Sequence, residues 1–176
     1  MSEQLLALPW KPLDPENIQD AFGEFRNWTL CGGFSIDMIV GRKTREHADI
    51  DIGVFRSQAE EALRALNDLL PYLCDPPGKL RRWNGEKVPE RIYDIWLLDR
   101  KASSWVMQVM IFDDDGETVY FKRDKSIFWS KENHAIVRNG IRVLNPMITM
   151  LYKITSSDLR EKDYADLHQL IKTTAV

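Results

Sequence analysis

Apolar residues recur at the spacing of an α-helix in five segments of this chain. In the first segment Ile18, Phe22 and Phe25 follow Asp14-Pro15, a pair that favours the start of a helix. In the third segment Ser57 and Glu60 have the spacing of a capping box, and the apolar stripe continues to Leu70. The predicted helices cover residues 15–26, 34–40, 57–70, 145–155 and about 157–172.

Alternation of apolar and polar residues predicts strands between these helices. In residues 49–55 the side chains of Ile50, Ile52 and Val54 share one face, and acids and a glycine share the other. Further strands are predicted over 28–31, 91–98, 104–112 and 118–122, whereas 123–141 has no clear period. This order predicts an α+β fold in which a small mixed sheet carries helices on one face. We expect a core domain over residues 1–144 and a C-terminal helical segment over 145–176, packed as one unit.

Composition restricts the partners and the compartment. The 24 basic and 27 acidic residues nearly balance, which argues against nucleic acid or a membrane surface as the main partner. The chain has two cysteines, too few for a disulfide framework, and no apolar run of transmembrane length or signal-peptide pattern. We therefore expect a protein of the reducing cytoplasm.

Two carboxylates stand out on the strand predicted over 49–55. Asp49 and Asp51 are two residues apart, so on a strand they point to the same face with Cα atoms roughly 6.5–7 Å apart. Such a pair can hold Mg²⁺, which prefers carboxylate, phosphate and water oxygens. The alternative is an exposed strand with two solvated acids.

Gly32 and Gly33 join a buried strand to a helix, where a backbone without side chains can approach an anion and the first amides of the helix point toward it. Several polar side chains between these glycines and the acidic strand are within reach of a triphosphate. These candidate phosphate contacts are Ser35, Arg42, Arg45 and His47. Solvated loop charges are the alternative interpretation. The spacing around Gly41 excludes a Walker A loop.

Together these residues form the pattern Gly-Gly-x-x-x-Asp … Gly-Arg-x-Thr-Arg-x-His-x-Asp-Ile-Asp. The pattern resembles the polymerase-β-like nucleotidyltransferases, in particular the aminoglycoside adenylyltransferase and lincosamide nucleotidyltransferase branch. The strong match covers about residues 28–55, and a weaker one runs from Pro146 through Lys153 to Asp166.

The resemblance implies roles for several residues. Asp49 and Asp51 would hold Mg²⁺, the turn containing Gly32, Gly33 and Ser35 would bind the nucleotide phosphates, and Lys153 would contact the nucleotide. The co-substrate would be a nucleoside triphosphate, with ATP expected.

The resemblance also implies a third carboxylate on a neighbouring strand, where this chain has Gln108. Glutamine cannot act as a base. If residues 92–98 and 104–110 form a hairpin centred near Arg100-Lys101, Asp94 lies roughly opposite Gln108 and shares its face. We hypothesise that Asp94 is the third catalytic acid beside Asp49 and Asp51. A register slip of one residue would point Asp94 to the other face.

The function expected from the resemblance is a Mg²⁺-dependent nucleotidyltransferase. It would move a nucleoside monophosphate from a nucleoside triphosphate to a hydroxyl of a small molecule, of the aminoglycoside or lincosamide kind, and release pyrophosphate. The acidic turn Asp113-Asp114-Asp115 could attract a cationic acceptor. Two alternatives remain: a toxin-like enzyme acting on RNA or protein, and a degenerate member that binds nucleotide without catalysis.

Overall fold

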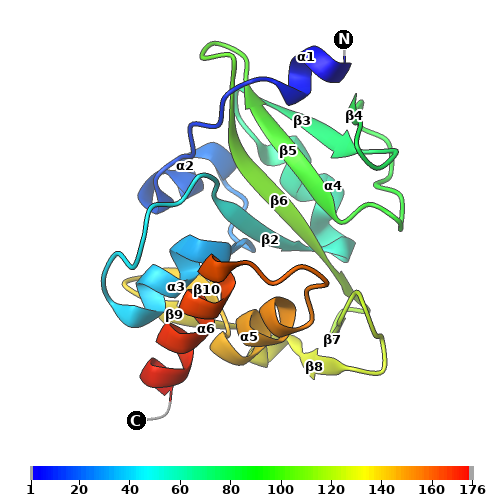
Figure 1. Ribbon diagram of the computed structural model, residues 1–176. Helices are drawn as coiled ribbons and strands as arrows, with labels where there is room; N and C mark the ends of the chain where they lie inside the picture. The colour runs from blue at the N-terminus through cyan, green and yellow to red at the C-terminus, as the bar shows by residue number, and fades with distance from the viewer. Residues whose placement is uncertain (1, 175–176) are drawn as a thin grey trace.

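The computed structural model describes residues 2–174 and is built around a mixed β-sheet with helices on both faces (Figure 1). The sheet has ten strands, eight of them in the order β4-β3-β5-β6-β2-β1-β10-β9, with β7 paired to β6 and β8 paired to β7. The strands are β1 Thr29–Cys31, β2 Asp51–Phe55, β3 Leu69–Cys74, β4 Leu80–Arg82, β5 Asp94–Asp99, β6 Ser104–Asp114, β7 Thr118–Tyr120, β8 Phe128–Ser130, β9 Ala135–Arg138 and β10 Ile141–Leu144.

Of the six helices in the described residues, five fall close to predicted segments, and the short helix Ser2–Leu6 was not predicted. The helices are α1 Ser2–Leu6, α2 Ile18–Phe22, α3 Gly32–Val40, α4 Ala59–Ala65, α5 Pro146–Ile154 and α6 Glu161–Thr174, with 3-10 turns at Pro15–Asn17, Arg56–Gln58 and Lys131–Asn133. Gly41 ends α3 in the left-handed conformation, as a C-terminal glycine should. The side chain of Asn145 caps α5 by accepting a hydrogen bond from the Met147 amide. No helix in the described part of the chain is long and apolar enough to cross a bilayer.

The sheet is mixed because β2 runs parallel to β6 and β1 runs parallel to β10, while its other pairs are antiparallel. The predicted α+β class with a mixed sheet is therefore confirmed, but the helices lie on both faces of the sheet and not on one face as expected. The sheet is larger than the small one expected, since several of its strands are only three or four residues long and have no readable alternation in the sequence. Two of these, β8 and β9, lie in residues 123–141, where no period was found.

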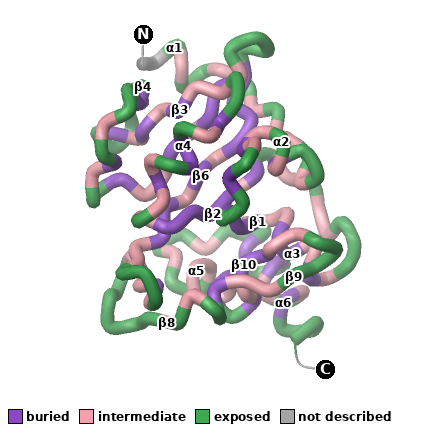
Figure 2. The backbone as a smooth tube through the Cα atoms, turned by 180° about the vertical axis from the view of Figure 1, so that it is seen from behind, coloured by how far each residue is buried: buried purple, intermediate pink, exposed green. Residues whose placement is uncertain are grey.

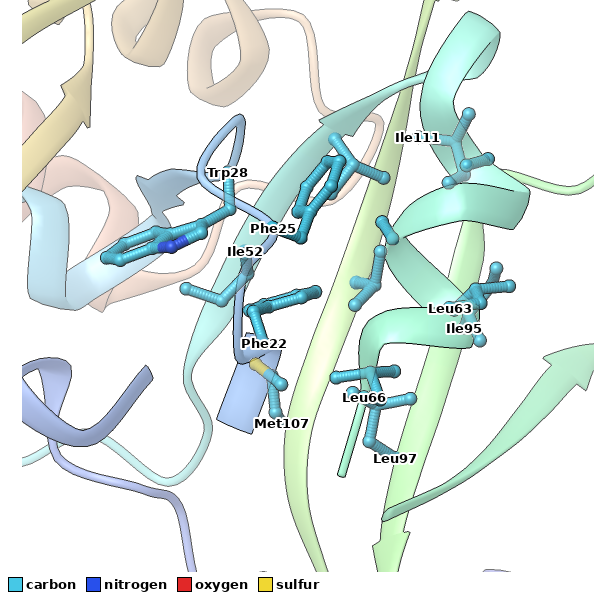
Figure 3. Packing of buried hydrophobic residues seen from close by; sticks show 14 of the residues in the cluster. Phe22, Phe25, Trp28, Ile52, Leu63, Leu66, Ile95, Leu97, Met107 and Ile111 are labelled. Carbon is cyan, nitrogen blue, oxygen red and sulfur yellow. The ribbon is translucent and has the colours of Figure 1, made fainter. Parts of the chain in front are cut away.

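One face of the sheet is covered by α2 and α4, and the main hydrophobic core lies between these two helices and the sheet (Figure 3). Phe22 from α2 and Leu63 from α4 pack on sheet residues such as Ile52, Ile95 and Met107. The opposite face carries Gln108, Met110 and Phe112 of β6, and α5 packs over its apolar end. Along the tube in Figure 2, β2 and β6 are mostly buried because they are covered on both sides.

Two predictions in this region were wrong. The helix predicted over 57–70 ends at Ala65, and Leu69, Leu70 and Pro71 belong to β3. The Pro71 carbonyl accepts a hydrogen bond from the Trp83 amide. The ring nitrogen of Pro71 faces the same edge of β3, beyond the last residue pair between β3 and β4. No strand requires an N–H donor at this position, so a proline is tolerated there.

The capping box is absent from this helix start. Ser57 donates its hydroxyl hydrogen to Asp114 at 2.7 Å, and Glu60 accepts a hydrogen bond from the Val88 amide at 2.6 Å. Tertiary partners thus replaced the local contacts that the sequence spacing suggested.

His134 is a buried aromatic-core residue. Its ring is 1% exposed, lies 4.6 Å from the Phe112 ring and 4.9 Å from the Phe55 ring, and accepts a hydrogen bond from the Trp129 indole N–H. Burial, helped by Arg142 and Lys131, lowers the pKa of His134 to about 3. The folded protein therefore holds this histidine neutral over the physiological range.

This burial predicts a pH-dependent stability. In the unfolded chain His134 has a pKa of about 6.5, so below this pH it binds a proton that it does not bind in the folded protein. The free energy of unfolding therefore falls as the pH is lowered toward 3. At pH 5 this contribution is about 2 kcal/mol. Urea unfolding of the wild type and of His134→Gln at pH 7 and pH 5 measures this contribution. Between the two pH values, the loss in free energy of unfolding should be about 2 kcal/mol smaller in His134→Gln, which keeps an acceptor for Trp129, than in the wild type.

The matched control is His168→Gln, which removes an exposed histidine on α6. It should lose stability between the two pH values as the wild type does. An unchanged pH dependence in His134→Gln would contradict the burial of a neutral imidazole.

Candidate functional site

Asp51 begins β2 and its carboxylate lies directly against the backbone of Gly32, the first residue of α3. A Cβ atom added at Gly32 would lie 2.0 Å from Asp51 Oδ2 and 2.9 Å from its Cγ. Gly32 also has φ +62°, a conformation that L-residues avoid. The strand β1, paired to β2 with Cys31 opposite Asp51, delivers the glycine to this place. The glycine turn and the acidic strand are therefore one site.

Asp49 and Asp94 are close enough to Asp51 to act on its ionisation. Burial, together with the charges of Asp49 and Asp94, raises the pKa of Asp51 to about 7, although Lys153 and Lys162 oppose this rise. Asp49 is exposed and precedes β2, which begins at Asp51 rather than at Asp49 as predicted. The site thus concentrates negative charge that its own lysines only partly balance.

Gln108 and Asp94 continue the polar row across the sheet. Gln108 on β6 pairs with Asp51 in the parallel ladder, and its side-chain amide donates a hydrogen bond to Asp94 Oδ1 at 3.0 Å. Asp94 itself lies opposite Met110, because Gln108 pairs with Trp96. The predicted hairpin and the shared face are therefore present, with Asp94 on the diagonal to Gln108 rather than opposite it. A register shift between Leu97 and Leu98 moves the pairing by one residue relative to the pairs beside the turn, and this shift keeps Asp94 on the face of Gln108.

Asp51 lines a hollow of about 220 Å³, which we call the Asp51 hollow. One wall consists of Cys31, at the end of β1, and Gly32, the first residue of α3. The other wall comes from α5, the segment after α5 and the residues after β7, elements that can be followed in Figure 1. Its cationic members are Lys122, Arg123, Lys153 and Arg160. The remaining lining residues are Met110, Leu144, Thr149, Tyr152, Ser156 and Asp163. A carboxylate at one side and four cations at the other suit a polyanion bound through a divalent cation.

Lys153, predicted from the resemblance, is held in this wall by α6. Its ammonium lies 2.9 Å from Asp163 Oδ1 and 2.8 Å from Asp166 Oδ2. Burial of Asp163 would raise its pKa, but hydrogen bonds from Lys153 and Arg160 outweigh it and hold the pKa well below its usual range. Two of the three N–H donors of Lys153 are thus occupied, and one remains for a ligand.

Arg45 and His47 lie at the second glycine. A Cβ atom added at Gly33 would be 2.2 Å from His47 Nδ1 and 3.0 Å from Arg45 Nη2. The Arg45 guanidinium binds both carboxylate oxygens of Asp166, at 3.1 and 2.9 Å, which joins the loop after α3 to α6. His47 Nε2 lies 2.7 Å from Asp37 Oδ2, while its buried Nδ1 has no hydrogen-bond partner in the described chain. This nitrogen is a free polar group beside Gly33.

Two predicted phosphate contacts lie elsewhere. The Ser35 hydroxyl is fully buried and donates its hydrogen to the Gly32 carbonyl at 2.7 Å, so it strengthens the first turn of α3 instead of facing a ligand. Arg42 is exposed, contacts Gln169 and lines a separate hollow of about 550 Å³ whose lining omits Asp49, Asp51 and Asp94. The sequence placed both residues by proximity alone, and helix geometry turns them away.

The sequence analysis missed Lys122, Arg123 and Arg160. The first two follow β7, at the edge of the segment without a period, and reach the site only because β7 folds back along β6. Arg123 donates hydrogen bonds to the Tyr152 carbonyl at 2.9 Å and to Thr155 Oγ1 at 2.6 Å. The Lys122-Arg123 pair is the signal that could have been noticed, but nothing in the sequence tied it to Asp51.

A neighbouring hollow of about 430 Å³, the Asp94 hollow, shares two wall residues with the first. It is lined by Cys74, Pro77, Arg91, Tyr93, Asp94, Lys122 and Arg123. Burial and the charge of Asp94 raise the pKa of the Cys74 thiol to about 11, so this part of the wall is neutral at pH 7. The volume is in the range of pockets that bind small molecules.

The carboxylates fit Mg²⁺ only in a particular way. Within residues 2–174, no three His, Cys, Asp or Glu side chains gather as a complete metal site. Mg²⁺ often takes one or two carboxylates and completes its shell with phosphate and water. Asp51 lies close to the negative charges of Asp49 and Asp94. This arrangement fits a Mg²⁺ ion that arrives with a triphosphate rather than one that is permanently bound.

Comparisons with known proteins show which proteins this chain resembles. A family profile described as aminoglycoside-2''-adenylyltransferase matches residues 18–72. The solved structure of the lincosamide antibiotic adenylyltransferase LnuA, with lincomycin bound, is similar over 98% of both chains, with 17% identity and a TM-score of 0.59. This chain has a nucleotidyltransferase fold. The resemblance to the aminoglycoside and lincosamide adenylyltransferase branch is thereby confirmed.

A second solved structure, ANT(2'')-Ia in complex with adenylyl-2''-tobramycin, matches at 14% identity and a TM-score of 0.45 over 84% of this chain and 79% of that chain. No curated protein matches the chain.

The contact of Gly32 with Asp51 predicts a specific non-additivity. Gly32→Ala should destabilise the fold by about 1–2 kcal/mol for its positive φ and by about 1–3 kcal/mol more for the clash with Asp51. Asp51→Ala removes the two clashing atoms, so the second cost should vanish in the double variant. Urea unfolding of the single and double variants measures this coupling.

Gly41→Ala is the control, since Gly41 has φ +81° but nothing within 4 Å of an added Cβ. It should show the φ cost alone and no coupling to Asp51→Ala. Additive effects of Gly32→Ala and Asp51→Ala would contradict the contact.

Proposed function

We propose that this protein is a nucleotidyltransferase that moves a nucleoside monophosphate, expected to be AMP from ATP, to a hydroxyl of a small antibiotic-like molecule. The observation that carries the proposal is the Asp51 carboxylate against the Gly32 backbone, facing four cations across one hollow. The similarity to LnuA, a structure solved with lincomycin bound, supports a small-molecule acceptor.

The triphosphate is assigned to the Asp51 hollow. Lys153 offers its third N–H, and Arg160 offers guanidinium donors that match phosphate oxygens. Beside them the Gly33 amide at the start of α3 and the Arg45 guanidinium form a second set of contacts, and buried His47 supports this turn through its contact with Gly33. Ser35 and Arg42 are not retained, for the reasons given above.

Asp49 and Asp51 are the proposed ligands of Mg²⁺, which when bound supplies charge neutralisation and polarisation of the α-phosphate. A bound divalent cation would favour the ionised form of Asp51, whose pKa of about 7 reflects burial and like charges. These carboxylates also fix where the α-phosphorus lies relative to the acceptor.

Asp94 is the proposed general base. The acceptor oxygen forms a bond to the α-phosphorus, the bond from that phosphorus to the α–β bridging oxygen breaks, and pyrophosphate leaves with the electron pair. The hydroxyl proton passes to Asp94, which Gln108 holds in place through its amide. Gln108 thus orients the base instead of marking lost catalysis.

The rest of the proposal concerns organisation and compartment. Residues 145–176 act as a C-terminal segment that closes the phosphate side of the site over the core of residues 1–144, through Lys153, Asp163 and Asp166. Free Cys31 and Cys74 fit a reducing cytoplasm, where ATP and Mg²⁺ are present. The near-neutral charge of the chain favours a small acceptor over RNA.

Asp51→Asn should have opposite effects on the free and the liganded protein. Without ligand, removing a buried charge beside Asp49 and Asp94 should leave the melting temperature at pH 8 unchanged or raised. With Mg·ATP at about 100 times its Kd, the wild type should gain about 2.7 kcal/mol, and the variant should lose most of this gain. Thermal unfolding with and without Mg·ATP measures both.

Asp68→Asn is the matched control, because Asp68 is exposed and pairs only with exposed Lys101. It should keep the full ligand-induced shift. A full shift in Asp51→Asn would remove the basis of the proposed function.

Asp94→Asn should separate catalysis from binding. Loss of a general base should lower kcat by about 10²–10⁴-fold, whereas the Kd of Mg·ATP should change little. Slow release of AMP and pyrophosphate with water as acceptor gives a readout that needs no known acceptor. Asp99→Asn, at the other end of β5, keeps its acceptor oxygen for Lys101 and Ala102 amides and should keep kcat. Equal kcat in wild type and Asp94→Asn would exclude Asp94 as the base.

A further inference from the structure

The Asp94 hollow is the place where an acceptor would lie, since Asp94 would take the hydroxyl proton there. It adjoins the Asp51 hollow through Lys122 and Arg123, which line both. A hydroxyl beside Asp94 can therefore reach a phosphate beside Asp51 while the rest of the acceptor fills the larger hollow. The charges of its wall then decide which acceptor fits.

Three cations and a single carboxylate line this hollow. The charge of Arg91 is balanced by Asp75, which does not line the hollow. The Arg91 guanidinium binds both carboxylate oxygens of Asp75, at 3.2 and 2.7 Å. Lys122 lies 3.9 Å from Asp94 and 5.4 Å from the centre of the Tyr93 ring. If Asp94 takes the proton of the acceptor hydroxyl, its carboxyl group becomes neutral and no longer balances the charge of Lys122.

Arg123 is the uncompensated charge. Its hydrogen bonds within the described chain go to a backbone carbonyl and a hydroxyl, and its guanidinium lies 5.7 Å from the Phe121 ring centre and 5.6 Å from that of Tyr152. All of these partners are neutral, so they fix the side chain in place without cancelling its charge. A fixed, unpaired guanidinium is a preformed site for a carboxylate or phosphate group.

The acids that might have favoured a cationic acceptor are already paired. Asp113 binds Arg56 at 2.7 Å and lies 3.4 Å from Lys125. Asp114 binds Lys131 at 2.6 Å. Two of the three charges of the acidic turn are thus balanced by cations within the protein, whereas exposed Asp115 accepts hydrogen bonds from the Tyr120 hydroxyl and from two backbone amides.

We propose that the acceptor carries an anionic group, a carboxylate or a phosphate, which binds Arg123 and Lys122 in the Asp94 hollow while its hydroxyl lies at Asp94. This inference rests on the proposed function and narrows its acceptor class. The same wall repels polycationic aminoglycosides, which would bring several ammonium groups against Arg123. The Tyr93 ring offers a flat surface for the body of the acceptor.

Two titrations test it with the full-length chain. The first measures the Kd of a non-hydrolysable ATP analogue with Mg²⁺, and its failure would count against the proposed function alone. The second titration compares the Kd values of glucose 6-phosphate, methyl α-glucoside and tobramycin. It is done with the analogue at saturation or, if the analogue does not bind, with the protein alone. We expect glucose 6-phosphate to bind at least tenfold more tightly than the other two, and increasingly weakly as salt is raised.

The variants assign this preference to the wall. Arg123→Gln and, independently, Lys122→Gln should each reduce the preference for glucose 6-phosphate at least threefold, and both should keep the wild-type circular dichroism spectrum. Arg26→Gln, at an exposed arginine paired loosely with Glu24, should keep the preference. Glucose 6-phosphate binding no tighter than methyl α-glucoside, tighter binding of tobramycin, or a preference unaffected by both wall variants would each overturn the proposal.

Discussion

The close approach of the Asp51 carboxylate to the Gly32 backbone is the constraint on which the site depends. Any residue with a side chain at Gly32 would force Asp51 to move, since its Cβ would lie 2.0 Å from Asp51 Oδ2. The contact brings the amide end of α3 and the start of β2 within reach of one ligand. It also buries a carboxylate among like charges, which raises the pKa of Asp51 to about 7. Such a group gains from meeting a cation.

The C-terminal helix completes this arrangement from a distance. Asp166 is 1% exposed and holds both Arg45 from the loop after α3 and Lys153 from α5. One buried carboxylate thereby fixes two cations that come from segments more than a hundred residues apart. Breaking such a buried pair leaves an uncompensated charge, so α6 is tied to the site as firmly as to the core. Packing of Leu170 against Ile36 adds an apolar contact between α6 and α3.

Prediction from sequence succeeded where local pattern and fold agreed. The Gly-Gly turn, the C-terminal stop at Gly41 and the capped helix after Asn145 follow from short-range chemistry. It failed where tertiary partners took over. Leu69 to Cys74 form a strand because β5 and β4 pair with them, although the same leucines continue a helical stripe.

The sequence by itself determined the catalytic candidates and their neighbourhood, because Gly32, Asp49 and Asp51 lie within one short run whose turn and strand have few alternatives. Tertiary structure decided which other groups join them. Asp94 shares the site only because β5 pairs with β6 in one register, and Arg123 only because β7 folds back along β6. Both placements depend on the register of a hairpin, including the shift between Leu97 and Leu98, which an apolar–polar pattern does not fix.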